Sequence, residues 1–392
     1  MKKLLAFALI VSVWACKEEK KEPSIAETMK TYTISQMMDN ESIAGGSFSP
    51  DKSKLLVSSN RSGIYNMYTI PTSGGEMMPV TQSDSSSVFA ISYFPKDERM
   101  LFRMDNNGNE IYHIFVRDTD GSFKDLTPEE GARSLFYQWS EDKSAFFYGS
   151  NKRDNRFVDL YKMDLESMTS ELVYENNDGY DVGVVSPNEK YVALSKSINT
   201  NDSDLFLYNL ESKELTQINE NQSGNAPQDF SPDGMAFYYT TDDGSEFSYL
   251  MKYNLANASY EKAMERDWDI SGSYFTDQGT YQVTYINEDA KNTIEVMEVA
   301  TGKNIDLPAV ENMEITSVSF SDDESMMRFY AGGSHTPSNL YVYNLETKEQ
   351  KRLTDVLNPE VQAQDLVKAE VVRYKSFDGL EIPAIYYKPH QA

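Results

Sequence analysis

Cysteine and histidine are scarce in this sequence of 392 residues, which contains one cysteine and three histidines. A single cysteine excludes any disulfide within the chain, so the folded part has to be stabilised by its hydrophobic core. A zinc site needs three or four converging ligands, and no such spacing of His, Cys or carboxylate residues occurs. We therefore predict no metal site and no cofactor.

Basic residues are also few, with 36 Lys and Arg against 62 Asp and Glu and a formal net charge of -26. Nucleic acid is excluded as a partner, because a phosphate backbone is bound through clustered Lys and Arg and no basic stripe is present. With 40% hydrophobic and 12% aromatic residues, the chain has enough apolar material for a globular core. Wholesale disorder is therefore excluded as well.

The N-terminus carries the pattern of an export signal. Met1-Lys2-Lys3 precedes an apolar run from Leu4 to Trp14, and eleven residues are too few to span a bilayer. Cys16 follows Val13-Trp14-Ala15, which resembles a relaxed bacterial lipobox; the alternative is a chance cysteine after an ordinary signal. We predict a signal peptide over residues 1–15 and lipid attachment at Cys16. The protein is then exported and anchored in the bacterial cell envelope, with the outer membrane favoured and either periplasmic or surface exposure possible.

A charged segment follows the cysteine and predicts a tether, residues 16–42, between the lipid anchor and the folded part. The remainder of the chain contains a repeat. Its marker is a turn of the type Ser-Pro-Asp between two apolar runs, and the middle residues of the copies are spaced by 45 or 46. These middle residues are Pro50, Pro95, Glu141, Pro187, Pro232, Asp277 and Asp322.

Each repeat has the composition of four short strands. Apolar runs stand before and after the turn, and a third begins 17 to 19 residues past its middle residue. A fourth is predicted at Val80-Thr81, Leu126-Thr127, Leu215-Thr216 and Leu353-Thr354. Nearly continuous apolar strands suit sheets that are covered on both faces by their neighbours. The pattern predicts an all-β fold, a seven-bladed β-propeller over residues 43–355.

Several segments resemble one peptidase family. Asn107-Gly108-Asn109-Glu110-Ile111-Tyr112, Ser150 to Asp154 and Asn201 to Tyr208 resemble the N-terminal propeller of the prolyl oligopeptidase family of serine peptidases, and are most similar to its acylaminoacyl-peptidase and dipeptidyl-aminopeptidase branch. Residues 356–392, with Ser376-Phe377-Asp378-Gly379-Leu380 and Tyr387-Lys388-Pro389, resemble that family's linker and the first strands of its α/β-hydrolase domain.

The sequence departs from the family at the catalytic residues. The oxyanion-hole segment, the G-x-S-x-G nucleophile elbow and the Asp and His of the triad do not follow Pro389. The strings Gly45-Gly46-Ser47-Phe48-Ser49 and Gly332-Gly333-Ser334-His335 lack the second glycine of the elbow and fall within the propeller. No catalytic residue can be assigned, and we expect this chain alone to be inactive.

Other candidate residues have ordinary structural explanations. His113 falls in a predicted strand and is expected to be a hydrogen-bonded core residue, whereas His335 and His390 are expected to be solvated. Asp181, Asp229 and Asp269 flank predicted first strands, where turn chemistry is favoured over an acid/base pair.

The resemblance implies a substrate-gating propeller of an exported peptidase. Such a propeller admits short or unfolded peptides to an α/β-hydrolase domain that carries the Ser-His-Asp triad. The alternative is a freestanding TolB-type propeller lipoprotein that binds protein or peptide without catalysis. A third hypothesis is a propeller lactonase or glycosidase. Cleavage specificity and oligomeric state stay open.

Overall fold

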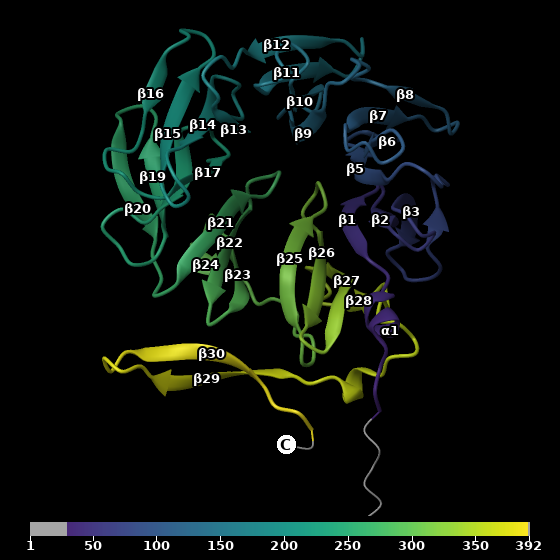
Figure 1. The fold of residues 1–392 in the computed structure, drawn as a ribbon. Coiled ribbons are helices and arrows are strands. Elements are labelled where there is room, and N and C mark those ends of the chain that lie inside the picture. The colour runs from purple at the N-terminus through teal and green to yellow at the C-terminus, as the bar shows by residue number, and fades with distance from the viewer. Residues whose placement is uncertain (1–29, 391–392) are drawn as a thin grey trace, which may run out of the picture.

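The structure is a computed structural model that describes residues 30–390. The predicted signal peptide, Cys16 and the first part of the predicted tether lie outside the described residues. Seven sheets of four strands, each in simple sequential order, are arranged around a ring (Figure 1). The neighbouring strands pair antiparallel, for example Leu55 with Ile70 in blade 1. The predicted seven-bladed β-propeller is confirmed.

The first four blades cover the N-terminal half of the ring. Blade 1 contains β1 (Ile43–Phe48), β2 (Lys54–Ser59), β3 (Asn66–Pro71) and β4 (Met78–Pro79). Blade 2 contains β5 (Val88–Phe94), β6 (Asp97–Met104), β7 (His113–Arg117) and β8 (Phe123–Asp125). Blade 3 contains β9 (Ser134–Trp139), β10 (Ala145–Ser150), β11 (Asp159–Asp164) and β12 (Ser170–Tyr174). Blade 4 contains β13 (Asp181–Val185), β14 (Tyr191–Ser197), β15 (Ser203–Asn209) and β16 (Leu215–Gln217).

The other three blades complete the ring. Blade 5 contains β17 (Asn225–Phe230), β18 (Ala236–Thr241), β19 (Tyr249–Asn254) and β20 (Ser259–Met264). Blade 6 contains β21 (Asp269–Phe275), β22 (Tyr281–Glu288), β23 (Lys291–Glu298) and β24 (Lys303–Asn304). Blade 7 contains β25 (Glu314–Phe320), β26 (Met326–Gly333), β27 (Thr336–Asn344) and β28 (Gln350–Arg352).

The repeated turns join the first and second strands of the blades and lie on one face of the ring, here called the turn face. In the turn of blade 1, the Ser49 hydroxyl donates to Asp51 Oδ1 at 2.6 Å, and the amide of Lys54 donates to Ser49 Oγ at 3.1 Å. The hydrogen bond from the Ser49 hydroxyl, followed by bonds from the amide and hydroxyl of Ser53, lowers the pKa of Asp51 to about 2. Because four antiparallel strands return the chain to its starting side, the chain enters and leaves the blades on the opposite face, here called the linker face.

The hydrophobic core is divided among the contacts between neighbouring blades. Seven buried clusters each join two adjacent blades; Leu56 and Phe102, for example, belong to the cluster between blades 1 and 2. The cluster between blades 5 and 6 is the smallest, with the buried residues Leu250, Ile270 and Ile286. Both faces of a blade are therefore apolar, which explains the nearly continuous apolar strands of the sequence.

Blades 7 and 1 close the ring by packing, since all four strands of each come from one continuous segment. Leu55 and Ile70 of blade 1 share a buried cluster with Leu340 and Val342 of blade 7. Lys52 forms an ion pair with Asp323 across the same junction.

The predicted position of the fourth strand is confirmed in blade 4, where Leu215-Thr216 lies in β16, and was wrong by a few residues in blades 1, 2 and 7. β4 ends at Pro79, β8 at Asp125 and β28 at Arg352, so the apolar–threonine pairs follow these strands. Their threonine hydroxyls accept hydrogen bonds from the third strands, from Met67 N to Thr81 at 2.9 Å and from Leu340 N to Thr354 at 2.8 Å. The threonine hydroxyl takes the place of a backbone acceptor for the third strand, which explains why an apolar–threonine pair recurs at this point of the repeats.

The two ends of the described chain meet at the linker face. A short helix α1 (Ile34–Met38) precedes blade 1, and a 3₁₀ turn η1 (Ala363–Asp365) follows blade 7. The Tyr32 hydroxyl donates to Asp365 Oδ2 at 2.5 Å, and the Asn358 side chain donates to the Gln36 carbonyl at 3.0 Å. Residues 30–390 contain no helix of sufficient length and apolarity to cross a membrane.

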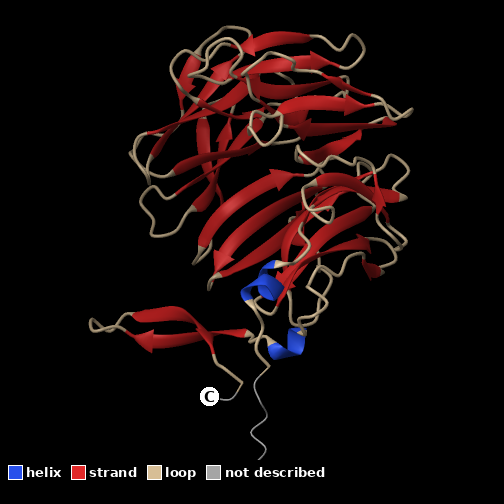
Figure 2. Ribbon diagram, turned by 45° about the vertical axis from the view of Figure 1, so that its right-hand side comes forward, coloured by secondary structure: helices blue, strands red, loops and turns tan. Residues whose placement is uncertain are grey.

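A hairpin of β29 (Ala369–Lys375) and β30 (Glu381–Tyr387) extends beyond blades 6 and 7, drawn in yellow in Figure 1 and set apart from the ring in Figure 2. Its large apolar side chains are exposed: Phe377, Leu380, Tyr374, Tyr387 and Ile385.

Candidate functional site

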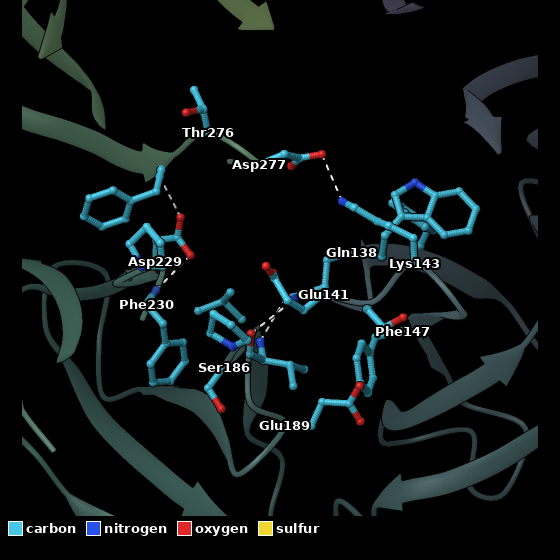
Figure 3. A pocket seen from close by; sticks show the side chains of 18 residues that line it. Gln138, Glu141, Lys143, Phe147, Ser186, Glu189, Asp229, Phe230, Thr276 and Asp277 are labelled. Carbon is cyan, nitrogen blue, oxygen red and sulfur yellow. Dashed lines mark hydrogen bonds and ion pairs between the residues drawn. The ribbon is translucent and has the colours of Figure 1, made fainter. Parts of the chain in front are cut away.

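Two cavities open where the central channel reaches the turn face. The first cavity, of about 280 Å³, is lined by blades 3, 4, 5 and 6 (Figure 3). The second cavity, of about 270 Å³, is lined by blades 7, 1, 2 and 3 together with Asp277 of blade 6. Phe136, Trp139, Lys143 and Asp277 line both cavities. These four residues therefore form the partition of the channel mouth.

The partition contains an ion pair between blades that are not neighbours. Lys143 Nζ of blade 3 lies 2.9 Å from Asp277 Oδ2 of blade 6, and Figure 3 shows this contact crossing the opening. Asp322 of blade 7 lines the second cavity beside Asp277. Burial raises the pKa of Asp322, and the negative charge of Asp277 raises it further.

Lys143 occupies a backbone position that disfavours lysine. Its φ is +58°; the equivalent turn position is glycine in blades 5 and 6 (Gly234 and Gly279) and a non-glycine residue with positive φ in blades 1, 4 and 7 (Lys52, Glu189 and Glu324). A non-glycine residue in this left-handed region costs on the order of 1 kcal/mol. Most of the repeated turns share this conformation, so it does not distinguish Lys143; what distinguishes this lysine is that its side chain crosses the channel to Asp277.

Asp229 lies in the first cavity at the junction between blades 5 and 6. It precedes the last residue of β17, and its carboxylate accepts hydrogen bonds from Phe230 N at 2.8 Å and Phe275 N at 2.7 Å. Burial raises the pKa of Asp229 to about 7, against the opposing effect of these two amides, and nearby Asp277 adds to the increase. The sequence-based assignment of Asp229 to turn chemistry was wrong, because its carboxylate joins two blades.

Two glutamines join blades in the same way. Gln138 of blade 3 donates to the Val185 carbonyl at 3.0 Å and accepts from Val185 N at 2.9 Å, so it acts as an added backbone partner for blade 4. Gln228 accepts from Ser273 N at 2.8 Å and joins blade 5 to blade 6. Together with Asp229, these amides fix the first strands around the channel, and blades 5 and 6 receive two such links where their apolar cluster is smallest.

A third cavity, of about 450 Å³, lies at the linker face between the hairpin and blades 6 and 7. Arg373 of β29 reaches both carboxylate oxygens of Asp289 at 2.8 and 2.7 Å, and Ala369 N donates to Ser334 Oγ at 2.8 Å. His335 lines this cavity, and burial, followed by the charge of Lys368, lowers its pKa. His335 is thus partly enclosed, in contrast to the expected solvated position.

The other residues considered in the sequence are not brought together. His113 begins β7, where its Nδ1 lies 2.7 Å from Asp125 Oδ2, as expected for a hydrogen-bonded histidine. Asp181 begins β13 with an exposed side chain, and Asp269 accepts a hydrogen bond from Ser248 N at 2.9 Å. Within residues 30–390, no group of three or more His, Cys, Asp or Glu residues is arranged to hold a metal ion.

Comparison with known proteins identifies the family. Residues 81–356 match the family model described as "Prolyl oligopeptidase, N-terminal beta-propeller domain". The chain belongs to the prolyl oligopeptidase family. Within it, dipeptidyl aminopeptidase BIII from Pseudoxanthomonas mexicana is 23% identical over 368 residues, which are 91% of this chain and 53% of that protein.

Solved structures show the same fold. Apo prolyl oligopeptidase B from Galerina marginata is similar with a TM-score of 0.65 and 15% identity, over 89% of this chain and 55% of that one. A prolyl endopeptidase structure from a study of inter-domain dynamics has the same TM-score and identity, over 89% of this chain and 54% of that one. The chain thus spans about half the length of the prolyl oligopeptidase-family relatives that it matches.

The sequence did not indicate the residues at the channel mouth of this prolyl oligopeptidase-family propeller. Lys143 and Asp277 belong to repeats 3 and 6, more than a hundred residues apart, and only the ring brings them together.

Proposed function

We propose that this chain is the substrate-gating propeller of an exported serine peptidase that acts on short or unfolded peptides. The Ser-His-Asp triad would belong to an α/β-hydrolase domain outside residues 1–392. The observation that carries the proposal is the channel mouth, where Lys143 and Asp277 cross the opening and leave two cavities of about 280 and 270 Å³. Cavities of this volume are far too small for a folded protein and suit a few side chains of an extended peptide.

The hairpin supports the same proposal from the linker face. It leaves the ring on the side opposite the gated mouth and exposes Tyr374, Phe377 and Leu380. Exposed large apolar residues that gather on one element mark an interaction surface. We assign this surface to the hydrolase domain, which would then cover the linker-face end of the channel. Export and lipid attachment at Cys16 are part of the proposal and rest on the N-terminal sequence.

The first test is the intact mass of the native product in its own cells. A product larger than the 392-residue chain by an α/β domain of roughly 200 to 250 residues is the expected result. A product that ends at Ala392 would overturn the proposal and favour the TolB-type alternative, in which the ring binds protein or peptide without catalysis. A lipid-modified Cys16 at the mature N-terminus would support the anchor, and an unmodified one would contradict it.

The purified chain provides a second test. We expect it to hydrolyse neither peptide nor ester substrates, because the residues that match the family contain no triad. Turnover that a serine-directed inhibitor abolishes would contradict this expectation.

A further inference from the structure

One arginine in the channel, Arg328, has no counter-ion among residues 30–390. Arg328 lies in β26, opposite Ser319 of β25, and its side chain lines the second cavity. Its Nε is buried and has no hydrogen-bond partner among the described residues. Burial lowers the pKa of the guanidinium, and the groups that oppose this effect are the tyrosines Tyr330, Tyr274 and Tyr285, with no carboxylate from residues 30–390 among them.

The lack of a partner is unusual in this chain, where acidic residues outnumber basic ones by 62 to 36. A partly buried cation without a counter-ion is unfavourable for folding, because the desolvation of its charge is not compensated. Lys143, the other cation that lines this cavity, is already paired with Asp277. Arg328 therefore retains donors that no described residue uses.

Two glycines make room for this side chain. Gly45 and Gly46 lie at a β-bulge in β1. Their φ values are +83° and +118°, and residues other than glycine rarely adopt such values. A Cβ at Gly46 would lie 3.1 Å from Arg328 Cδ and 3.2 Å from its Nε. The side chain of Arg328 in blade 7 thus packs against the glycine backbone of blade 1, beside the cavity.

The rest of the cavity wall combines two carboxylates, Asp322 and the Asp277 that is paired with Lys143, with apolar and aromatic side chains. The apolar side chains include Phe48, Ile91, Phe94, Trp139 and Phe320. An arginine without an ion-pair partner among the described residues, next to such apolar side chains, is complementary to a ligand that presents a carboxylate next to a hydrophobic side chain. Arginine binds carboxylates through two parallel hydrogen bonds, which makes it the stronger and more specific partner in such sites.

We propose that the second cavity binds the carboxylate of a peptide through Arg328 and its adjacent apolar side chain through the aromatic wall. The carboxylate can come from the C-terminus of a peptide that ends in a hydrophobic residue or from an Asp or Glu side chain. The choice of a peptide as ligand rests on the proposed function, whereas binding itself requires no catalytic domain.

Calorimetric titration of the purified chain tests this proposal. The probes are N-acetyl-Ala-Ala-Phe with a free carboxylate, its C-terminal amide and N-acetyl-Asp-Ala-Phe-amide. We expect the free acid to bind and the amide to bind about tenfold more weakly or not at all, since it lacks the charge-assisted bonds. Recovered binding of the Asp-containing amide would identify side-chain carboxylates as a second source, and its failure would restrict the site to C-termini.

Three variants assign the binding to Arg328. Arg328→Met removes the guanidinium and is expected to abolish the preference for the acid, while Gly46→Ala is expected to weaken it because the added Cβ displaces the guanidinium. Arg156→Met is the matched control, since Arg156 is exposed and paired with Asp154. The melting temperature of each variant shows that the ring is folded. No binding of the free acid, equal binding of acid and amide, or an unchanged preference in folded Arg328→Met would overturn the site. The intact-mass experiment judges the peptidase assignment separately.

Discussion

Asp229 shows how the protonation of one carboxylate between two blades makes the stability of the ring depend on pH. Its folded-state pKa of about 7 lies above the ordinary value of 3.8, so between these values the folded chain binds a proton that the unfolded chain does not. The free energy of unfolding therefore falls as the pH rises from about 4 to 7, and the contribution of this residue is constant above that range. The structural role of the Asp229 carboxylate is to accept hydrogen bonds from an amide of each blade, one at each oxygen.

Substitution of Asp229 by asparagine tests this account. Asparagine has one acceptor oxygen, so one of the two amides loses its partner, and we expect a loss of about 1–3 kcal/mol of unfolding free energy at pH 5. At pH 8 the deficit should be smaller, because the wild type then carries a buried ionised carboxylate. Guanidinium unfolding at both pH values measures the difference.

The matched control for that measurement is Asp233→Asn. The Ser231 hydroxyl lowers the pKa of Asp233, so its titration lies below pH 5 and its deficit should be equal at pH 5 and 8. A deficit for Asp229→Asn that stays constant or grows toward pH 8 would show that Asp229 does not titrate in this window.

At the scale of elements, the repeat predicted the blades because each blade is made from one continuous segment. The turn residues, the apolar runs and the spacing all act within about 45 residues, so they are visible in the sequence. The fourth strands of blades 1, 2 and 7 were placed a few residues too late. Threonines that follow these strands, such as Thr81 and Thr354, bond the third strand through their hydroxyls, so their sequence pattern resembles that of a paired strand.

The candidate site could not be predicted in the same way. Lys143, Asp277 and Arg328 come from blades 3, 6 and 7, and each looks ordinary within its own repeat. Their proximity depends on ring closure and on the bulge at Gly45 and Gly46, neither of which leaves a local pattern that assigns a partner. Asp229 was misassigned for the same reason, because its second hydrogen bond is to Phe275 of the next blade.

The hairpin is the element whose attachment to the ring can be tested directly. The ion pair between Arg373 and Asp289 and the bond from Ala369 N to Ser334 Oγ connect it to blades 6 and 7. Arg373→Met should speed amide hydrogen exchange in residues 367–375 and leave the exchange of β22 and β26 unchanged. Arg352→Met is the control, since its ion pair with Asp355 lies next to blade 7 and away from the hairpin. Unchanged exchange in residues 367–375 would show that other contacts hold the hairpin.

At the scale of the whole molecule, seven apolar clusters hold neighbouring blades together, and the Lys143–Asp277 ion pair adds a contact across the ring. The ring carries a strong net negative charge, and several carboxylates converge on the channel mouth. A single lysine among them reduces their mutual repulsion and narrows the opening. The same residue thus contributes to the stability of the closed ring and to the proposed gate.

Exchange of the two charges tests whether blades 3 and 6 interact across the channel in solution. Lys143→Asp should destabilise the ring, because it places another carboxylate beside Asp277 and Asp322, although aspartate tolerates the left-handed backbone at position 143 better than lysine. Asp277→Lys should destabilise it as well, by leaving two lysines together. The double variant should recover part of both losses, with a coupling of about 0.2–1 kcal/mol in unfolding free energy, as is typical of a partly exposed ion pair. Raised salt should weaken the coupling. Strictly additive effects of the two substitutions would show that the channel mouth is open in solution and that the gate has to be sought elsewhere in the ring.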